Sequence, residues 1–155
     1  MYNLLENVFI SKELYQTMIE PLCDKYDMTQ AEMVVLLFLA NNPQKDTATD
    51  IVEKRRMTKS SVSMAARALQ ERGLIIGQHV DGNHRSVHLR VCDSALKIIE
   101  DGRKAQSKFF EILTGNFTEA ERTAFNYYIK RVTNNIRNKN NSAERQRLFI
   151  ERRYT

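Results

Sequence analysis

The segment from residue 47 to residue 91 carries three short patterns that follow one another directly. TATDIVEKRRM and TKSSVSMAARALQERG place apolar residues at helical spacing. LIIGQHVDGNHRSVHLRV reads as two strands, residues 74–80 and 86–91, around a DGNH turn in which Gly82 and Asn83 can take a positive φ. Helix, turn, helix and basic-tipped hairpin in this order is the layout of a winged helix-turn-helix.

The second helical pattern has clear ends and one apolar face. Thr58 is a candidate N-cap, Gly73 is a candidate C-terminal glycine, and Thr47 with Asp50 marks the start of the preceding helix in a similar way. The apolar face repeats at i, i+3, i+4 and i+7, through Val62, Ala65, Ala66 and Leu69. We therefore expect this helix to pack on one side and to present a polar side outward.

The positive charge of the chain is concentrated in the same segment. Residues 54–90 hold eight Lys and Arg against two acids, a net charge of +6, whereas the whole chain has a formal net charge of +5. A basic stripe as local as this is an electrostatic footprint for phosphate. Together with the order of the elements, it favours binding to double-stranded DNA.

Helical patterns precede and follow this segment. Residues 4–22 have apolar residues at helical spacing, and Pro21 is expected to kink this helix or to end its first part. Thr29 and Glu32 form a candidate capping box before the apolar run 33–40.

The chain after the hairpin is also helical in pattern. One helix is expected to end at Gly115–Asn116, and Thr118 with Glu121 is a third candidate capping box. The next helix has an apolar stripe at Phe125, Tyr128, Ile129, Val132 and Ile136. The asparagine-rich residues 134–141 are expected to fray, and residues 142–154 to form a short basic helix.

These patterns predict a mainly helical α+β fold, a winged helix-turn-helix with N- and C-terminal dimerisation helices in one compact domain. Residues 1–28 would form the N-terminal dimerisation helix, 29–92 the DNA-binding region, and 93–155 the C-terminal dimerisation helices and a basic tail. The apolar stripes near both ends suit packing against a second subunit. Two-fold symmetry would then place two recognition helices about 34 Å apart.

Several classes of protein are disfavoured by the composition. The longest uninterrupted apolar run, residues 33–40, is too short to cross a bilayer, and the first residues lack a secretory pattern. The 2 cysteines cannot build a disulfide framework, so a reducing cytoplasm is expected. Nucleotide-binding, hydrolase and zinc-protease motifs do not occur, so we predict neither an enzyme nor a cofactor. A cysteine hydrolase built on Cys92 and a hairpin histidine has no recognisable spacing.

From about residue 12 to residue 137 the chain resembles the MarR family of bacterial transcriptional regulators. The likeness lies in DKYDMTQAEMVVLLFLA, in TATDIVEKRRMTKSSVSMAARALQERGLI and in NHRSVHLRV. Thr58–Ser63 and Glu71–Ile75 match the family's entry to and exit from the recognition helix, and Met28–Thr29 matches the start of its second helix. The resemblance implies a cytoplasmic homodimer, in most relatives a repressor, that binds a pseudo-palindromic operator. A small, often aromatic or phenolic effector, or a thiol oxidation, would release it.

Three positions depart from the family pattern. Asn83–Arg85 stand where Asp-x-Arg is common, so the arginine would be held less firmly. Arg55–Arg56 replace an apolar–Gly turn, which adds phosphate-facing charge and makes the turn harder to form. Cys92 replaces a capping threonine, so Asp93 or Ser94 is expected to cap the following helix instead.

The outward face of the recognition helix supplies the expected base contacts, with Arg67 the best candidate for guanine. Lys59 and Ser61 would bind phosphate, and Arg85 would enter the minor groove at the wing. The complete set of expected DNA contacts is Arg55, Arg56, Thr58, Lys59, Ser60, Ser61, Ser63, Met64, Arg67, Asn83, His84 and Arg85.

Other interpretations of single residues remain open. The histidines at 79, 84 and 88, with Cys92, could hold zinc, although exposed histidines near phosphate are favoured and no metal ligand is assigned. Cys23 is expected to be a buried inert thiol and Cys92 to be partly exposed, so a thiol- or metal-responsive regulator is an alternative.

The position of an effector site is a further expectation. Tyr15, Met18 and Met33 could line a crevice between the dimer helices and the DNA-binding lobe, or could simply pack in the core. A non-specific architectural DNA-binding protein is a second alternative. It would bind every duplex alike, whereas a regulator prefers its own site by about 10³ or more.

Overall fold

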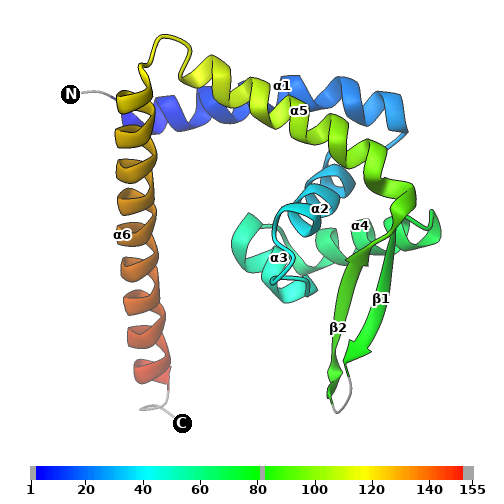
Figure 1. The fold of residues 1–155 in the computed structure, drawn as a ribbon. Coiled ribbons are helices and arrows are strands. Elements are labelled where there is room, and N and C mark those ends of the chain that lie inside the picture. Colours follow the sequence, from blue (N-terminus) through cyan, green and yellow to red (C-terminus); the bar gives the residue numbers. More distant parts are fainter. Residues whose placement is uncertain (1–2, 81–82, 152–155) are drawn as a thin grey trace. The chain divides into compact units, whose positions relative to one another are not determined.

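The computed structural model describes residues 3–80 and 83–151, and it describes side chains except those of residues 80, 83–85 and 141–151. Two units are distinguished, Met1–Glu111 and Ile112–Thr155. The first contains α1 (Leu4–Tyr26), α2 (Gln30–Asn41), α3 (Ala48–Arg55), α4 (Lys59–Glu71), β1 (Ile75–Val80) and β2 (Asn83–Val91), followed by most of α5 (Leu96–Leu113). The second unit contains α6 (Glu119–Glu151) (Figure 1). The mainly helical winged helix-turn-helix fold expected from the sequence is confirmed.

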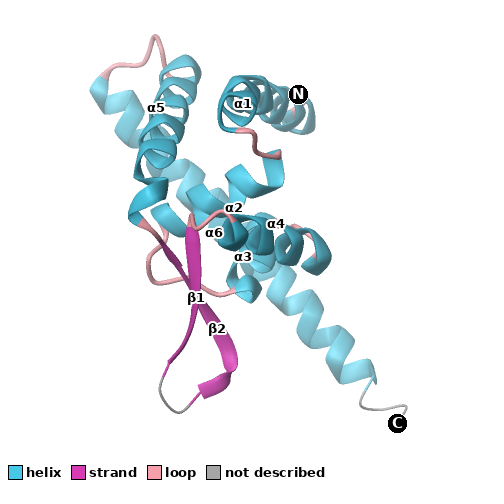
Figure 2. Ribbon diagram, turned by 90° about the vertical axis from the view of Figure 1, so that its right-hand side faces the viewer, coloured by secondary structure: helices cyan, strands magenta, loops and turns pink. Residues whose placement is uncertain are grey.

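The core of the first unit forms around α2, which is apolar on nearly every side. Val35, Leu36 and Leu37 are buried, and the apolar face of α4 packs against α2. The four residues predicted for that face, Val62, Ala65, Ala66 and Leu69, are all buried. Since α2 is covered on several sides, it fixes α4 in place, and Figure 2 shows α3 and α4 lying close to it.

The first helix does not end at Pro21, contrary to one of the two outcomes predicted there. Helix α1 begins at the N-cap Asn3 and runs through Pro21 to Tyr26. Ile19 and Cys23, on either side of the proline, are both buried in the core. Their packing holds the helix together across the backbone hydrogen bond that proline cannot make.

The wing is an antiparallel pair, with Ile75 opposite Val91 and Gln78 opposite His88 (Figure 2). The second strand begins at Asn83, three residues before the predicted Ser86, so Asn83 and His84 belong to the strand and not to a four-residue turn. Continued pairing satisfies backbone groups that a longer turn would leave open.

The helix after the wing begins differently from the prediction. Residues Asp93–Ala95 form a 3₁₀ turn that directly follows Cys92 in the sequence. Cys92 is the N-cap residue of this turn, and its side chain makes no capping hydrogen bond. The expectation that Asp93 or Ser94 would cap the helix is wrong, because Cys92 holds the N-cap position and both residues lie inside the turn that follows it. The Ser94 hydroxyl donates instead to the Gly73 carbonyl at 2.7 Å.

The second unit is dominated by one long helix. Thr118 and Glu121 form the predicted capping box, with Thr118 N–H donating to Glu121 Oε2 at 2.7 Å and Glu121 N–H donating to Thr118 Oγ1 at 3.3 Å. The predicted fraying of residues 134–141 and a separate helix from residue 142 are wrong, since α6 is continuous to Glu151. Among the described residues, no helix is long and apolar enough to span a membrane.

Candidate nucleic-acid interface and the neighbouring groove

Helix α4 is fixed at both ends by hydrogen bonds that its own sequence provides. Thr58 Oγ1 accepts from Ser61 N–H at 3.1 Å, which is the predicted N-cap. At the other end Gly73 has a φ of 67°, Gly73 N–H donates to Gln70 O and Leu74 N–H donates to Leu69 O. This is the Schellman arrangement, in which glycine takes the left-handed position without steric cost.

The outer face of α4 is exposed along its length. Lys59, Ser60, Ser63, Met64 and Arg67 are exposed, whereas Ser61 is half-buried. Met64 is 73% exposed and places a large apolar side chain on this outer face. The face therefore combines hydroxyl groups, two cations and an apolar thioether, a set that can contact both phosphates and base edges.

Arg67 is held in an ion pair in this structure. Its Nε donates to Glu71 Oε1 at 2.9 Å, and the two side chains are 82% and 64% exposed. An exposed i,i+4 pair contributes about 0.3–0.5 kcal/mol. Arg67 can therefore leave Glu71 at little cost when a stronger acceptor is present.

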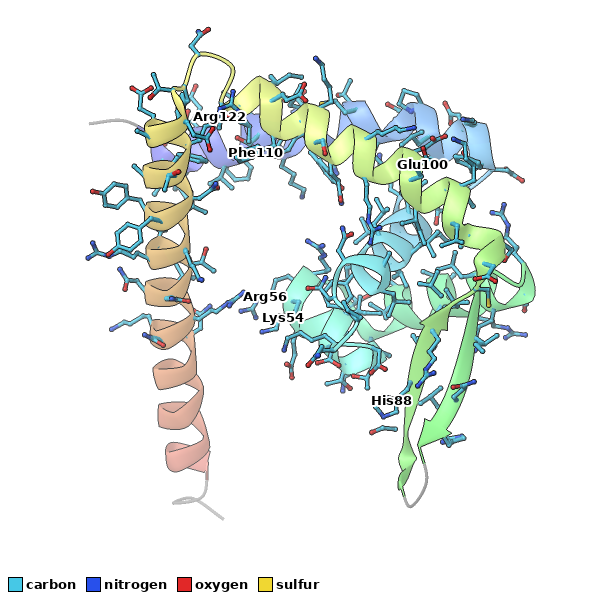
Figure 3. All side chains as sticks on the ribbon, viewed as in Figure 1. Lys54, Arg56, His88, Glu100, Phe110 and Arg122 are labelled. Carbon is cyan, nitrogen blue, oxygen red and sulfur yellow. The ribbon has the colours of Figure 1, made fainter. Side chains whose placement is uncertain are left out.

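Arg55 is the last residue of α3, and Arg56, its C-cap, begins the turn to α4. Arg56 adopts the left-handed conformation, with a φ of 54° and a ψ of 36°. The Arg55 guanidinium lies over the Phe38 ring, 5.2 Å from its centroid. Figure 3 shows the side chains of Lys54 and Arg56 projecting from this end of α3.

The base of the wing is attached to the start of α3 by a contact that sequence reasoning missed. His88 Nδ1 lies 2.7 Å from Asp46 Oδ1, and Leu89 N–H donates to Asp46 O at 2.7 Å. Thr47 and His88 also form an isolated bridge. Figure 3 labels His88 on this strand. The side chains of Asn83, His84 and Arg85, predicted for the wing tip, lie outside the described residues.

The structure offers no support for zinc at the histidines that it describes. His79 stands opposite Val87 while His88 stands opposite Gln78, so alternation of side chains puts the two imidazoles on opposite faces of the hairpin. Within residues 3–79 and 86–140, no group of three His, Cys, Asp or Glu side chains could hold a metal ion.

A groove of about 730 Å³ lies next to the helix-turn-helix. Tyr15, one of the predicted effector residues, is in its wall, where it meets Phe109 edge-on at 5.2 Å between ring centroids and accepts a hydrogen bond from Gln106 Nε2 at 3.2 Å. Met33 is instead fully buried in the core, and Met18 is not in the lining. The complete lining is Lys12, Tyr15, Gln30, Ala31, Val34, Leu37, Arg55, Arg56, Met57, Gln106 and Phe109.

The two cysteines differ in exposure as the sequence predicted. Cys23 is buried in the core and Cys92 is half-buried. Burial, with a smaller effect from nearby acidic side chains, raises the pKa of the Cys23 thiol. A raised pKa lowers the thiolate fraction, which makes Cys23 a poor nucleophile.

Comparisons with known proteins agree with this geometry. Residues 26–86 match the model of the MarR family. The chain is 22% identical over 116 residues, 75% of its length and 69% of the relative's, to YdgJ of Bacillus subtilis (strain 168), an uncharacterised helix-turn-helix transcriptional regulator.

Solved structures show the same fold. A MarR-family regulator from Listeria monocytogenes, complexed with a 26mer DNA, has a TM-score of 0.76 and 19% identity over 88% of this chain and 90% of that one. Bordetella bronchiseptica BpsR, whose DNA binding is described as regulated by 6-hydroxynicotinic acid, has a TM-score of 0.64 and 17% identity over 85% and 94%.

Proposed function

We propose that this chain, whose residues 26–86 match the model of the MarR family, is a transcriptional regulator of that family: a homodimeric repressor that binds a pseudo-palindromic operator and is released by a small-molecule effector. The observation that carries the proposal is the outward face of α4, which is fixed at both ends and exposes Lys59, Ser60, Ser63, Met64 and Arg67. Such a helix fits the major groove of B-DNA.

Each residue of the interface has a proposed role. Arg67 binds guanine, Ser60 and Ser63 reach base edges, and Met64 contacts a thymine methyl group. Phosphates are bound by the residues at the entry to the helix, namely Arg55, Arg56, Thr58, Lys59 and Ser61. At the wing, Asn83, His84 and Arg85 follow the adjacent backbone and minor groove.

DNA selection tests this assignment. Full-length protein is used to select duplexes from a random library, and its affinity for the selected and a scrambled duplex is measured at several salt concentrations. Arg67→Ala should weaken binding to the selected duplex by about 1–3 kcal/mol and reduce the base preference at one position of the site. Arg103→Ala, on α5, is the control and should retain full selectivity. Equal affinity of the wild-type protein for both duplexes would favour the architectural alternative.

Homodimerisation is supported by apolar side chains that both units leave in water. Leu4, Leu5, Val8 and Phe9 of α1 and Tyr128, Ile129, Val132 and Ile136 of α6 are all at least 45% exposed. Removing such surfaces from water is the main favourable term in subunit association. Ile136→Asp should shift the sedimentation coefficient towards the monomer, whereas Met64→Asp, on the outer face of α4, should leave the dimer intact.

The lining of the groove suits a small aromatic effector that carries a negative charge. Tyr15 and Phe109 provide an aromatic wall, while Lys12, Arg55 and Arg56 provide cations. Benzoate and its neutral analogue benzamide are suitable probes for calorimetric titration. Benzoate should bind more tightly than benzamide, and Arg55→Gln should weaken benzoate about tenfold, the value of one charged hydrogen bond. Lys54→Gln, a neighbour outside the lining, should bind benzoate as the wild type does.

A further inference from the structure

Arg72 stands at the C-cap of α4, and its guanidinium is bonded to the end of another helix. Nη1 donates to the Asp27 carbonyl at 2.8 Å and Nη2 donates to the Tyr26 carbonyl at 2.7 Å. These carbonyls belong to the last residue of α1 and to its C-cap, where helix geometry leaves acceptors open and the helix dipole is negative. The planar fork of arginine matches two adjacent acceptors in a way that lysine does not.

The same end of α1 is bonded on its other side to α5. The Tyr26 hydroxyl donates to Asp101 Oδ2 at 2.7 Å, and Lys25 Nζ lies 2.8 Å from the same oxygen. Tyr26 therefore accepts from Arg72 through its carbonyl and donates to Asp101 through its side chain. A continuous series of polar contacts runs from the end of α4, through the last turn of α1, to the middle of α5.

We infer that Arg72 is a positioning residue that ties the recognition helix to the helices α1 and α5. The inference rests on the proposed function, in which α4 contacts DNA and α1 takes part in the dimer. Any change in the position of α1 or α5 on ligand binding or assembly then acts on α4 through the hydrogen bonds of its C-cap residue, and not only through the apolar core.

The geometry also separates Arg72 from the residues that hold DNA. Both terminal nitrogens of its guanidinium are occupied by backbone carbonyls, and the Glu32 carboxylate lies 3.9 Å from Nη1. Its side chain is 38% exposed, compared with 82% for Arg67 on the outer face of the same helix. Arg72 adds to the positive field of this segment, but both of its terminal nitrogens donate to carbonyls of the protein.

Arg72→Lys is the informative variant, because it keeps the charge and removes the two-pronged contact. Arg103→Lys is a matched control. The Arg103 guanidinium also binds a helix-end carbonyl, that of Ala40 at 2.7 Å, but it joins α5 to α2 and does not involve α4. The readout is the ratio of affinities for a duplex selected by the wild-type protein and for a scrambled duplex, measured beside the melting temperature.

We expect Arg72→Lys to lower this ratio by roughly 2- to 30-fold, the range for substitutions along a coupled network. Arg103→Lys should leave the ratio unchanged. Tyr26→Phe, which removes the hydroxyl that donates to Asp101 and leaves the carbonyl that Arg72 binds, should lower the ratio in the wild-type background and have no further effect in Arg72→Lys.

Three results would overturn the inference. They are an unchanged ratio in Arg72→Lys, a fall of equal size in Arg103→Lys at an equal change in melting temperature, or additive effects of Arg72→Lys and Tyr26→Phe. If the wild-type protein selects no sequence at all, the proposed function itself fails, and the positioning role fails with it. If the wild-type protein is selective and Arg72→Lys leaves the ratio of affinities unchanged, the positioning role alone is rejected.

Discussion

Arg56 occupies a backbone conformation that favours glycine, so Arg56→Gly should make the protein more stable. Its φ of 54° and ψ of 36° lie in the left-handed region. That conformation costs an L-residue about 1–2 kcal/mol, whereas glycine enters it freely. Glycine loses more backbone entropy on folding, by about 0.5–1 kcal/mol. The difference predicts a net gain in the free energy of unfolding of about 0.5–1 kcal/mol.

Thermal unfolding at matched protomer concentrations measures this gain, because the stability of the proposed dimer would depend on protomer concentration. For a chain of this size, the gain corresponds to a rise in melting temperature of about 1–4 °C. Arg56→Ala is the control, since it removes the same charge but keeps a Cβ in the left-handed conformation. Asp27→Gly, at a φ of 50°, should gain less, because aspartate tolerates this conformation better than arginine.

The same substitution should weaken DNA binding while it stabilises the fold. Both Arg56→Gly and Arg56→Ala remove one phosphate-facing cation, which should reduce the slope of binding against salt by about one. A stability difference between the two variants with equal loss of binding would separate the backbone effect from the charge effect. If Arg56→Gly is no more stable than Arg56→Ala, the argument from backbone strain is refuted.

Three further outcomes follow from the packing and the charges. A Cβ on Gly102 would lie 2.5 Å from Leu37 Cδ2, so Gly102→Ala should lower the free energy of unfolding by about 1–3 kcal/mol, measured by urea denaturation. Hydrogen bonds from lysine and tyrosine hold the pKa of Asp101 well below its ordinary 3.8, so the stability it adds is present above that pH and is lost as the pH falls further. Asp101→Asn should flatten this acid dependence in thermal melts. A maleimide should label Cys92 faster than Cys23 at neutral pH, as mass spectrometry can follow, and the reverse order would revive thiol sensing through Cys23.

Local signals in the sequence predicted the helix-turn-helix because its boundaries are set by neighbours three or four residues apart. Thr47 and Thr58 mark where their helices begin and Gly73 marks where α4 ends, each through hydrogen bonds to the adjacent turn. The failures occur where a residue with an unfavourable propensity lies inside a longer helix. Pro21 stays within α1 because residues on both sides of it are buried in the core. The asparagines of residues 134–141 each destabilise a helix by less than about 1 kcal/mol relative to alanine.

The groove is harder to predict because its wall comes from segments that are distant in the sequence. Lys12, Arg55 and Phe109 lie on α1, α3 and α5, so they come together only in the folded chain. Periodicity shows that a residue faces inward or outward, but it does not show which inward positions stay unfilled. Periodicity therefore places Tyr15 and Met33 alike on the inward faces of their helices, although Met33 is buried in the core and Tyr15 lines the groove.

The basic stripe of residues 54–90 illustrates how a charge count and a contact differ. All of its cations contribute to the long-range field that attracts DNA, whichever partners they have. For direct contacts the partners matter. Arg67 is held by one exposed carboxylate, a pair that contributes well under about 1 kcal/mol and yields to a base or phosphate. Arg72 is held by two carbonyls at the C-terminal end of α1, where the helix supplies no N–H donor, so its release would remove the donor of both. A substitution at Arg67 should therefore change which bases the protein prefers, whereas a substitution at Arg72 should change the position of the recognition helix α4.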